Sequence, residues 1–206
     1  MAKYIIFDFD GTVADTYRDT LVIANEIKKE QGGKIKIKLE EVREYGIKRL
    51  IKESGLPVWK IARFIHQAQS RLKEKNDLKL FPEMPELFKE LARKYKMGIV
   101  SSNDEEIIRK VLQKYQVENL FEFIYSDSSL FGKHLVLKKM RRKHRLDREE
   151  IVYVGDEDRD VSAAKKDGIK IIAVTWGFNS EKRLQQENPD YLASSVKELL
   201  GIISRI

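Results

Sequence analysis

Short apolar runs rich in Ile and Val alternate along the chain with stretches of helical periodicity. The runs predict buried strands at residues 4–9, 97–100, 123–125, 151–154 and 169–174. Between them, apolar residues spaced three or four apart predict helices near residues 87–91, 107–115 and 161–164. Alternating strands and helices predict an α/β protein whose parallel sheet is covered by helices on both faces.

The segment of residues 16–80 departs from this alternation, because it has several helical patterns and no strand pattern. A Gly32-Gly33 break and a Gly55-Leu56-Pro57 turn separate its predicted helices. Phe81-Pro82 then returns the chain to the sheet, since proline disfavours helix at the residue before it. We therefore predict a core of residues 1–15 and 81–206, and a small all-helical domain of residues 16–80 inserted after the first strand.

The composition limits the classes of protein to which this chain can belong. With 206 residues, 42% of them hydrophobic and 35% charged, the chain predicts one soluble, folded core with a modest insertion. No stretch is apolar for long enough to span a bilayer, and residues 1–6 lead into a strand without a cleavable signal, so we expect a cytoplasmic protein without a membrane partner. The chain has no cysteine, and its three histidines lack ligand spacing, so oxygen ligands must hold any metal.

The formal net charge of +7 raises the possibility of a nucleic-acid partner, because Lys and Arg contacts to phosphate dominate that kind of affinity. The basic residues, however, are spread along the chain and interleaved with Glu. The densest cluster, residues 138–145, falls on one predicted helix, where a solvated face is the better interpretation. Nucleic acid is thus not the expected partner, although a non-catalytic basic nucleic-acid-binding scaffold stays an alternative.

Polar residues follow the predicted strands where each strand ends, and in parallel sheets the loops at that edge form the ligand crevice. They are Asp8 and Asp10 after the first strand, Ser101 and Ser102 after the second, and Asp156 and Asp160 after the fourth. Asp8 and Asp10 are two residues apart in extended chain, so their side chains emerge on the same side. With Asp156 they would repel one another unless a cation lay between them, and oxygen ligation by few carboxylates favours Mg²⁺, with all three aspartates as its ligands.

Four motifs occur in order along the chain. They are residues 7–16 (FDFDGTVADT), residues 98–103 (GIVSSN), Lys133, and residues 153–156 (YVGD) continuing to Asp160. With these motifs the chain resembles the haloacid dehalogenase-like hydrolases, and more closely their phosphoglycolate-phosphatase-like branch, over essentially its whole length. The resemblance implies a Rossmann-like core of three α/β/α layers and a helical cap, residues 16–80, that closes over the active site.

The resemblance also implies roles for individual residues. Asp8 would attack phosphorus to form an aspartyl-phosphate, and Asp10 would serve as acid and then as base. Lys133 would complete the catalytic set and offset the charge of Asp8. The residues expected to hold the substrate phosphate are Gly11, Ser101, Ser102 and Lys133. Thr12 and Asp160 would support the metal ligands without binding the ion.

Two positions depart from the family pattern, and the cap offers two candidates for specificity. His134 stands after Lys133 where most relatives have proline. Glu157 stands where a small hydroxyl residue is common, and we interpret it and Asp158 as facing solvent. In the cap, Arg43 and Lys48 are the candidates for contacting an anionic substrate.

The combined prediction is a Mg²⁺-dependent phosphatase that hydrolyses a small phosphorylated metabolite, a phosphoglycolate-like monoester, through an aspartyl-phosphate. The second carboxylate, Asp10, favours phosphoryl transfer, because the family's dehalogenases lack it. A phosphomutase of the β-phosphoglucomutase type, which shares the core, stays an alternative. The motifs specify phosphoryl chemistry without specifying the leaving group.

Overall fold

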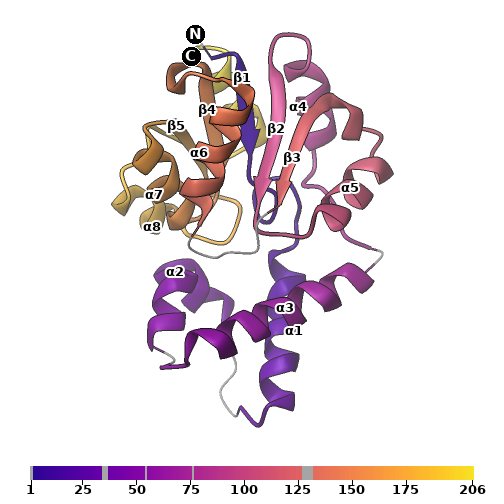
Figure 1. Cartoon of the computed structure of the whole chain (residues 1–206), viewed down its shortest axis with the longest axis vertical. Coiled ribbons are helices and arrows are strands. Elements are labelled where there is room, and N and C mark those ends of the chain that lie inside the picture. Colours follow the sequence, from indigo (N-terminus) through magenta and orange to yellow (C-terminus); the bar gives the residue numbers. More distant parts are fainter. Residues whose placement is uncertain (1, 34–36, 54, 76, 127–131) are drawn as a thin grey trace.

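The computed structural model describes residues 2–33, 37–53, 55–75, 77–126 and 132–206. Within these residues a sheet of six parallel strands forms the centre of the protein, in the order β3-β2-β1-β4-β5-β6 (Figure 1). The strands are β1 (Tyr4–Phe7), β2 (Lys96–Ser101), β3 (Phe121–Ser126), β4 (Ile151–Gly155), β5 (Lys170–Val174) and β6 (Tyr191–Ala193). The predicted α/β fold is confirmed, and β6 is the strand that the sequence pattern missed.

Helices cover both faces of the sheet because side chains alternate along each strand. Ile5 and Phe7 of β1 pack with α4 (Met84–Leu91), α5 (Glu105–Lys114) and α9 (Val196–Ile203). Tyr4 and Ile6 belong to the opposite layer, with α6 (Lys133–His144), α7 (Asp158–Asp167) and α8 (Glu181–Gln186). Short 3₁₀ turns, η1 (Glu118–Leu120) and η2 (Arg148–Glu150), lead into β3 and β4. The result is the predicted Rossmann-like three-layer core.

Three further helices lie between β1 and α4 in the sequence, and we call them the helical insertion. They are α1 (Tyr17–Glu30), α2 (Leu39–Glu53) and α3 (Val58–Glu74). They lie beyond the ends of the strands to which the arrows point, so they face the carboxyl edge of the sheet (Figure 1). Gly46 interrupts α2 with non-helical backbone angles (φ 72°, ψ 155°). The division into residues 1–15 with 81–206 and residues 16–80 stays a prediction.

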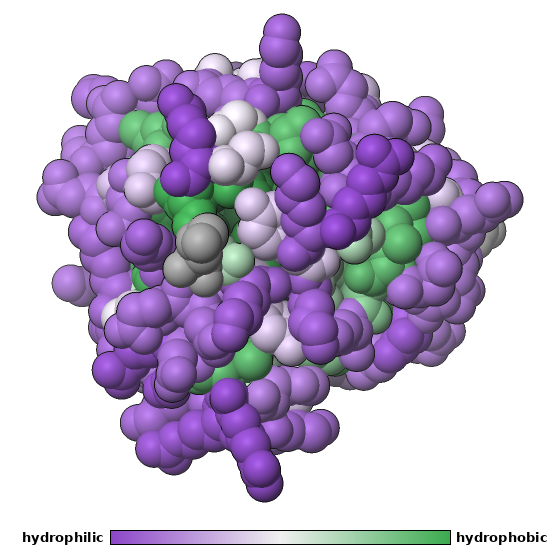
Figure 2. Space-filling view, turned by 90° about the horizontal axis from the view of Figure 1, so that it is seen from above, coloured by the Kyte–Doolittle hydropathy of each residue, from purple (hydrophilic) through white to green (hydrophobic). Residues whose placement is uncertain are grey.

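The surface at the opposite end of the molecule is mostly hydrophilic, with small separate hydrophobic patches (Figure 2). The basic helix α6 is amphipathic: Val136, Leu137 and Met140 are buried, whereas Lys138 and Lys139 are exposed. This arrangement agrees with a solvated basic face. Among the described helices, none combines the length and the apolar character needed to cross a membrane.

Candidate active site

The sheet order brings the predicted site residues to one edge. Strands β2, β1 and β4 are neighbours, and β1 pairs with β2 on one side and with β4 on the other. Asp8 directly follows β1, Ser101 ends β2, and Asp156 directly follows β4. The chain runs from β1 to β2 on one side and from β4 to β5 on the other, and α/β proteins form their ligand crevice where connections diverge in this way.

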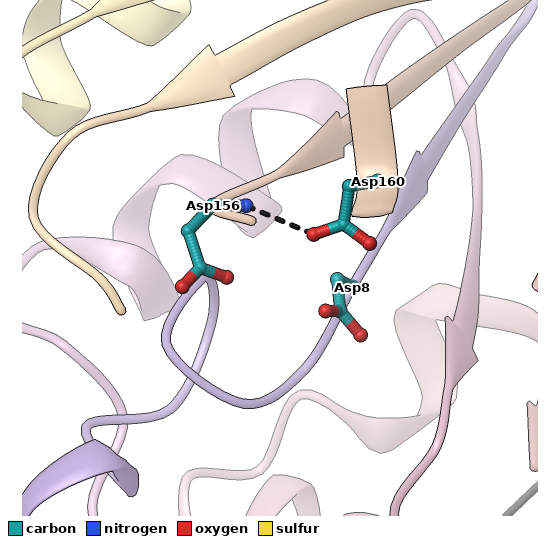
Figure 3. A group of neighbouring side chains, drawn as sticks. All are labelled: Asp8, Asp156 and Asp160. Atoms are coloured by element: carbon teal, nitrogen blue, oxygen red, sulfur yellow. Dashed lines mark hydrogen bonds between the residues drawn. The ribbon is translucent and has the colours of Figure 1, made fainter. Parts of the chain in front are cut away.

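Three buried carboxylates meet at this edge. Ligand atoms of Asp8, Asp156 and Asp160 all lie within 4.8 Å of one another. Figure 3 shows the three side chains converging from the end of β1, the end of β4 and the first turn of α7. Their relative exposures are 1%, 0% and 0%, so protein and not bulk water surrounds the group. Its oxygen-only donor set suits a hard divalent cation.

Hydrogen bonds from other residues of the site orient the carboxylates of Asp156 and Asp160. Asp156 accepts from the hydroxyl of Thr12 and from the backbone N–H of Phe178, both over 2.6 Å. Asp160 accepts from the backbone N–H groups of Asp156 (3.2 Å) and Glu157 (3.0 Å). Thr12 and Asp160 thus contact other members of the site, and the supporting part expected for them stays a prediction.

Lys133 supplies a cation to this group. It is the first residue of α6, and its side chain is 6% exposed. Its Nζ lies 2.8 Å from Oδ2 of Asp8 and 2.5 Å from Oδ1 of Asp160. The next residue, His134, is half-buried, and Lys133 contacts the acidic group although a histidine follows it. The absence of the usual proline has therefore not displaced Lys133 from the site.

The electrostatics indicate an excess of negative charge. Burial raises the pKa of Asp8 to about 7, although Lys133 acts in the opposite direction. Burial, with the charges of Glu157 and Asp160, raises the pKa of Asp156 well above its usual value. A buried carboxyl group with a raised pKa resists ionisation until positive charge is supplied. The residues present therefore fit a divalent cation.

Asp10 lies beside this group in a different hydrogen-bond environment. Its Oδ1 accepts from the hydroxyl of Thr16 (2.6 Å) and from the side-chain amide of Asn103 (2.9 Å). Burial raises the pKa of Asp10, against the effect of these two hydrogen bonds. A carboxyl group that retains a proton suits the acid role predicted for Asp10. Asp10 is not one of the three residues whose ligand atoms lie within 4.8 Å of one another, so its part as a metal ligand stays a prediction.

The residues predicted to hold phosphate surround the same point. Ser101 is buried, and its Oγ accepts from the backbone N–H of Asn103 over 3.1 Å. Gly11 has a φ of 76°, and a Cβ on it would lie 2.3 Å from Oδ2 of Asp156. Its own N–H donates to the carbonyl of Ala14 over 2.9 Å. Gly11 thus lets the loop after β1 approach Asp156, and its part in binding phosphate stays a prediction.

Two acidic residues correct the sequence analysis. We interpreted Glu157 and Asp158 as facing solvent, but they are only 3% and 5% exposed. Glu157 accepts from Arg159 Nε over 2.8 Å, and Asp158 accepts from Arg183 Nη2 over 2.6 Å. The first turn of α7 is enclosed, and this enclosure comes from tertiary contacts that residue type alone does not reveal. Arg159, also buried, is a further site residue that the sequence analysis did not identify.

The loop after β5 completes the surroundings of Asp156. Phe178 donates its N–H to this residue, and a Cβ on Gly177 would lie 2.1 Å from its Oδ2. Arg43 of the helical insertion donates from Nη1 to the carbonyl of Gly177 over 2.5 Å. The other predicted specificity residue, Lys48, belongs to α2, but its side chain lies outside the described part of the chain.

The helical insertion also reaches the loop after β2. Gln69, on α3, donates from Nε2 to the carbonyl oxygen of Ser102 over 2.6 Å. Ser102 is half-buried, and its Oγ lies 3.4 Å from Nη2 of Arg159. The insertion therefore contacts the loop after β2, which carries Ser102, and the loop after β5, which donates a hydrogen bond to Asp156.

Comparison with known proteins shows the family of this chain. The family model described as haloacid dehalogenase-like hydrolase matches residues 5–174, which include all four motifs. The chain belongs to the haloacid dehalogenase-like hydrolases. A phosphoglycolate phosphatase of Synechococcus elongatus is 31% identical to this hydrolase over 206 residues, covering 98% of this chain and 97% of that one. A phosphoglycolate phosphatase of Aquifex aeolicus is 25% identical over 221 residues.

Solved structures agree on the fold of this haloacid dehalogenase-like hydrolase. A predicted phosphatase from Clostridium acetobutylicum superposes with a TM-score of 0.87, at 19% identity and with both chains fully covered. A haloacid dehalogenase-like hydrolase from Streptococcus pneumoniae gives a TM-score of 0.76 at 24% identity, with 98% of each chain covered. At these identities the likeness extends to the fold alone.

Proposed function

We propose that this protein is a Mg²⁺-dependent phosphatase that hydrolyses a small phosphate monoester, phosphoglycolate-like, through an aspartyl-phosphate on Asp8. The observation that carries the proposal is the buried carboxylate of Asp8, 2.8 Å from the ammonium of Lys133 and within the group formed with Asp156 and Asp160. The similarity to phosphoglycolate phosphatases over nearly the whole chain supports it. The substrate would accordingly be a small phosphorylated metabolite.

The chemistry proceeds in two displacements. A carboxylate oxygen of Asp8 attacks phosphorus, and the ester P–O bond breaks as Asp10 gives its proton to the leaving oxygen. Asp10 then takes a proton from water, whose oxygen attacks phosphorus and releases inorganic phosphate from Asp8. Lys133 and Ser101 hold phosphoryl oxygens during both steps, by charge and by a hydroxyl hydrogen bond.

Asp8 and Asp156 would hold Mg²⁺, with Asp10 as the further predicted ligand. The ion would supply positive charge that offsets both the carboxylates and the phosphoryl oxygens. Its binding requires ionised carboxylates, and the raised pKa of Asp8, caused first by burial, indicates how strongly ion binding and proton release are linked here.

The helical insertion is proposed to act as the cap of this enzyme. It faces the carboxyl edge of the sheet, where the acidic group lies. A cap in this position would exclude water from the first displacement and supply contacts to the leaving group. Arg43 and Lys48 are the residues proposed to meet an anionic leaving group.

The test is inorganic phosphate release from a panel of phosphate esters, including phosphoglycolate, with Mg²⁺ and with EDTA. We expect release that EDTA abolishes, that Mg²⁺ restores and that Asp8→Asn removes without loss of the folded state. Isomerisation of a sugar phosphate without phosphate release would favour a phosphomutase. Salt-sensitive nucleic-acid binding that survives Asp8→Asn, without any turnover, would favour the basic scaffold.

A further inference from the structure

Arg159 is a buried cation that directly precedes Asp160 of the acidic group, and the mechanism above gives it no part. It lies in the first turn of α7 and is 9% exposed. One edge of its guanidinium is fixed: Nε and Nη2 both donate to Oε1 of Glu157, over 2.8 Å and 2.5 Å. Nη2 also lies 3.4 Å from Oγ of Ser102. The guanidinium therefore has a defined orientation.

The other end of the guanidinium lacks an acceptor. Nη1 of Arg159 is buried and has no hydrogen-bond partner among the described residues. An unpaired buried N–H on a charged group costs free energy, so such groups in native proteins are usually completed by a ligand or by water. Arginine stays charged at all physiological pH values, so the acceptor best suited to Nη1 is an anion.

The contact of Arg159 with Ser102, together with its electrostatic effect on the reacting groups, points to phosphate as this anion. Burial raises the pKa of both Asp8 and Asp10, and the charge of Arg159 acts against that rise at each of them. The guanidinium therefore lies within electrostatic reach of the nucleophile and of the acid. It also contacts Ser102, which is one of the residues expected to hold phosphate.

The side-chain donors of Lys133 and Ser101 leave phosphoryl oxygens without a partner. The ammonium of Lys133 has three N–H bonds, and it already contacts Asp8 and Asp160. Ser101 contributes one hydroxyl hydrogen. A phosphoryl group presents several acceptor oxygens with negative charge, so these two residues cannot saturate it.

We propose that Arg159 binds the phosphoryl group: Glu157 holds the Nε and Nη2 edge, and Nη1 donates to a phosphoryl oxygen of the substrate and of the inorganic phosphate product. This inference rests on the proposed phosphatase function. It assigns Glu157 as a positioning residue that orients the guanidinium through a fixed ion pair.

The competing explanation is structural, with Arg159 serving only to neutralise Glu157. The double variant Glu157→Gln with Arg159→Gln separates the two, because it removes both charges together and leaves no unpaired buried carboxylate. A structural role predicts normal phosphate binding in the double variant. A phosphate-binding role predicts its loss.

The experiment is calorimetric titration of the full chain with inorganic phosphate in the presence of Mg²⁺, and separately with Mg²⁺ alone. We expect the double variant to bind phosphate about tenfold to a hundredfold more weakly than the parent, as for the loss of one charged hydrogen bond, with Mg²⁺ affinity unchanged. The control, Arg142→Gln on the exposed face of α6, should match the parent. Parental phosphate affinity in the double variant would overturn the inference.

If the double variant does not fold, the variant Arg159→Lys tests the same inference. A single ammonium cannot both pair with Glu157 and reach the position of Nη1, so phosphate affinity should again fall, and an unchanged affinity overturns the inference. Failure of the proposed function gives a different result, since the parent would then release phosphate from no ester. In that case the phosphate titrations of parent and variants still decide the role of Arg159. A parent protein that binds no phosphate would overturn the inference that Arg159 binds it.

Discussion

Arg43, on helix α2, donates from Nη1 to the carbonyl oxygen of Gly177 over 2.5 Å. The next residue, Phe178, donates its backbone N–H to Asp156 over 2.6 Å. The backbone N–H of Ser180 in turn donates to the carbonyl of Arg43 over 2.9 Å. A short series of hydrogen bonds thus connects the helical insertion to a carboxylate of the acidic group.

Replacing Arg43 should loosen this loop even without substrate. We expect Arg43→Ala to accelerate hydrogen exchange at the amides of Gly177 and Phe178 by about fivefold to tenfold, because a lost hydrogen bond is worth about 1 kcal/mol. Arg63→Ala, an exposed change on α3 of the same insertion, is the control. Unchanged exchange together with a raised KM would instead favour a contact between Arg43 and the substrate alone.

A methyl group at Gly11 should disturb the site more than one at Gly32. Both glycines have positive φ, 76° and 81°, so an alanine at either is strained by about 1–2 kcal/mol. A Cβ on Gly11 would also lie 2.3 Å from Asp156, whereas one on Gly32 has nothing within 4 Å. Urea unfolding should therefore find Gly11→Ala less stable than Gly32→Ala by roughly 1–3 kcal/mol. Equal losses would mean that the contact with Asp156 relaxes without cost.

The sequence predicted the centre of the site because of a property of parallel sheets. Asp8, Ser101 and Asp156 each lie at or just after the carboxyl end of a predicted strand, and the carboxyl ends of parallel strands share one edge. The strand pattern alone was therefore enough to predict that these residues lie close together. The short strand β6, Tyr191–Ala193, gave no recognisable pattern, because three residues are too few to show the period of a strand.

The surroundings of the site could not be predicted in the same way. Glu157 and Asp158 are charged, which favours exposure, but the fold encloses the first turn of α7 and gives each an arginine partner. Arg159 lies 57 positions from Ser102 in the sequence, and only the folded chain brings the two together. Contacts of this kind depend on tertiary packing and leave no periodic signal.

The metal-free protein should lose stability as the pH rises through neutrality. Burial raises the pKa of Asp8 from its usual 3.8 to about 7, so between these values the folded state holds a proton that the unfolded chain has released. The contribution of this proton is fully present below about pH 4 and is lost as the pH rises through about 7. In EDTA, urea titrations from about pH 5 to about pH 8 should give a falling free energy of unfolding. Asp8→Asn should flatten that fall by a few kcal/mol, on the order expected for such a shift. Parallel curves for parent and variant would contradict the assignment.

Mg²⁺ should stabilise the folded protein through Asp156. A cation that binds only the folded state adds roughly 2.7 kcal/mol at a concentration about a hundred times its Kd. For a chain of this size, that corresponds to a Tm increase of about 5–10 °C. Asp156→Asn removes one carboxylate charge from the group of three, so we expect its Tm to respond little to Mg²⁺. Asp77→Asn, at an exposed position, controls for the loss of a charge elsewhere and should keep the full response.

Thermal unfolding followed by circular dichroism, with Mg²⁺ and with EDTA, measures these shifts. An equal increase in Asp156→Asn and in the parent would mean that the ion binds at another position.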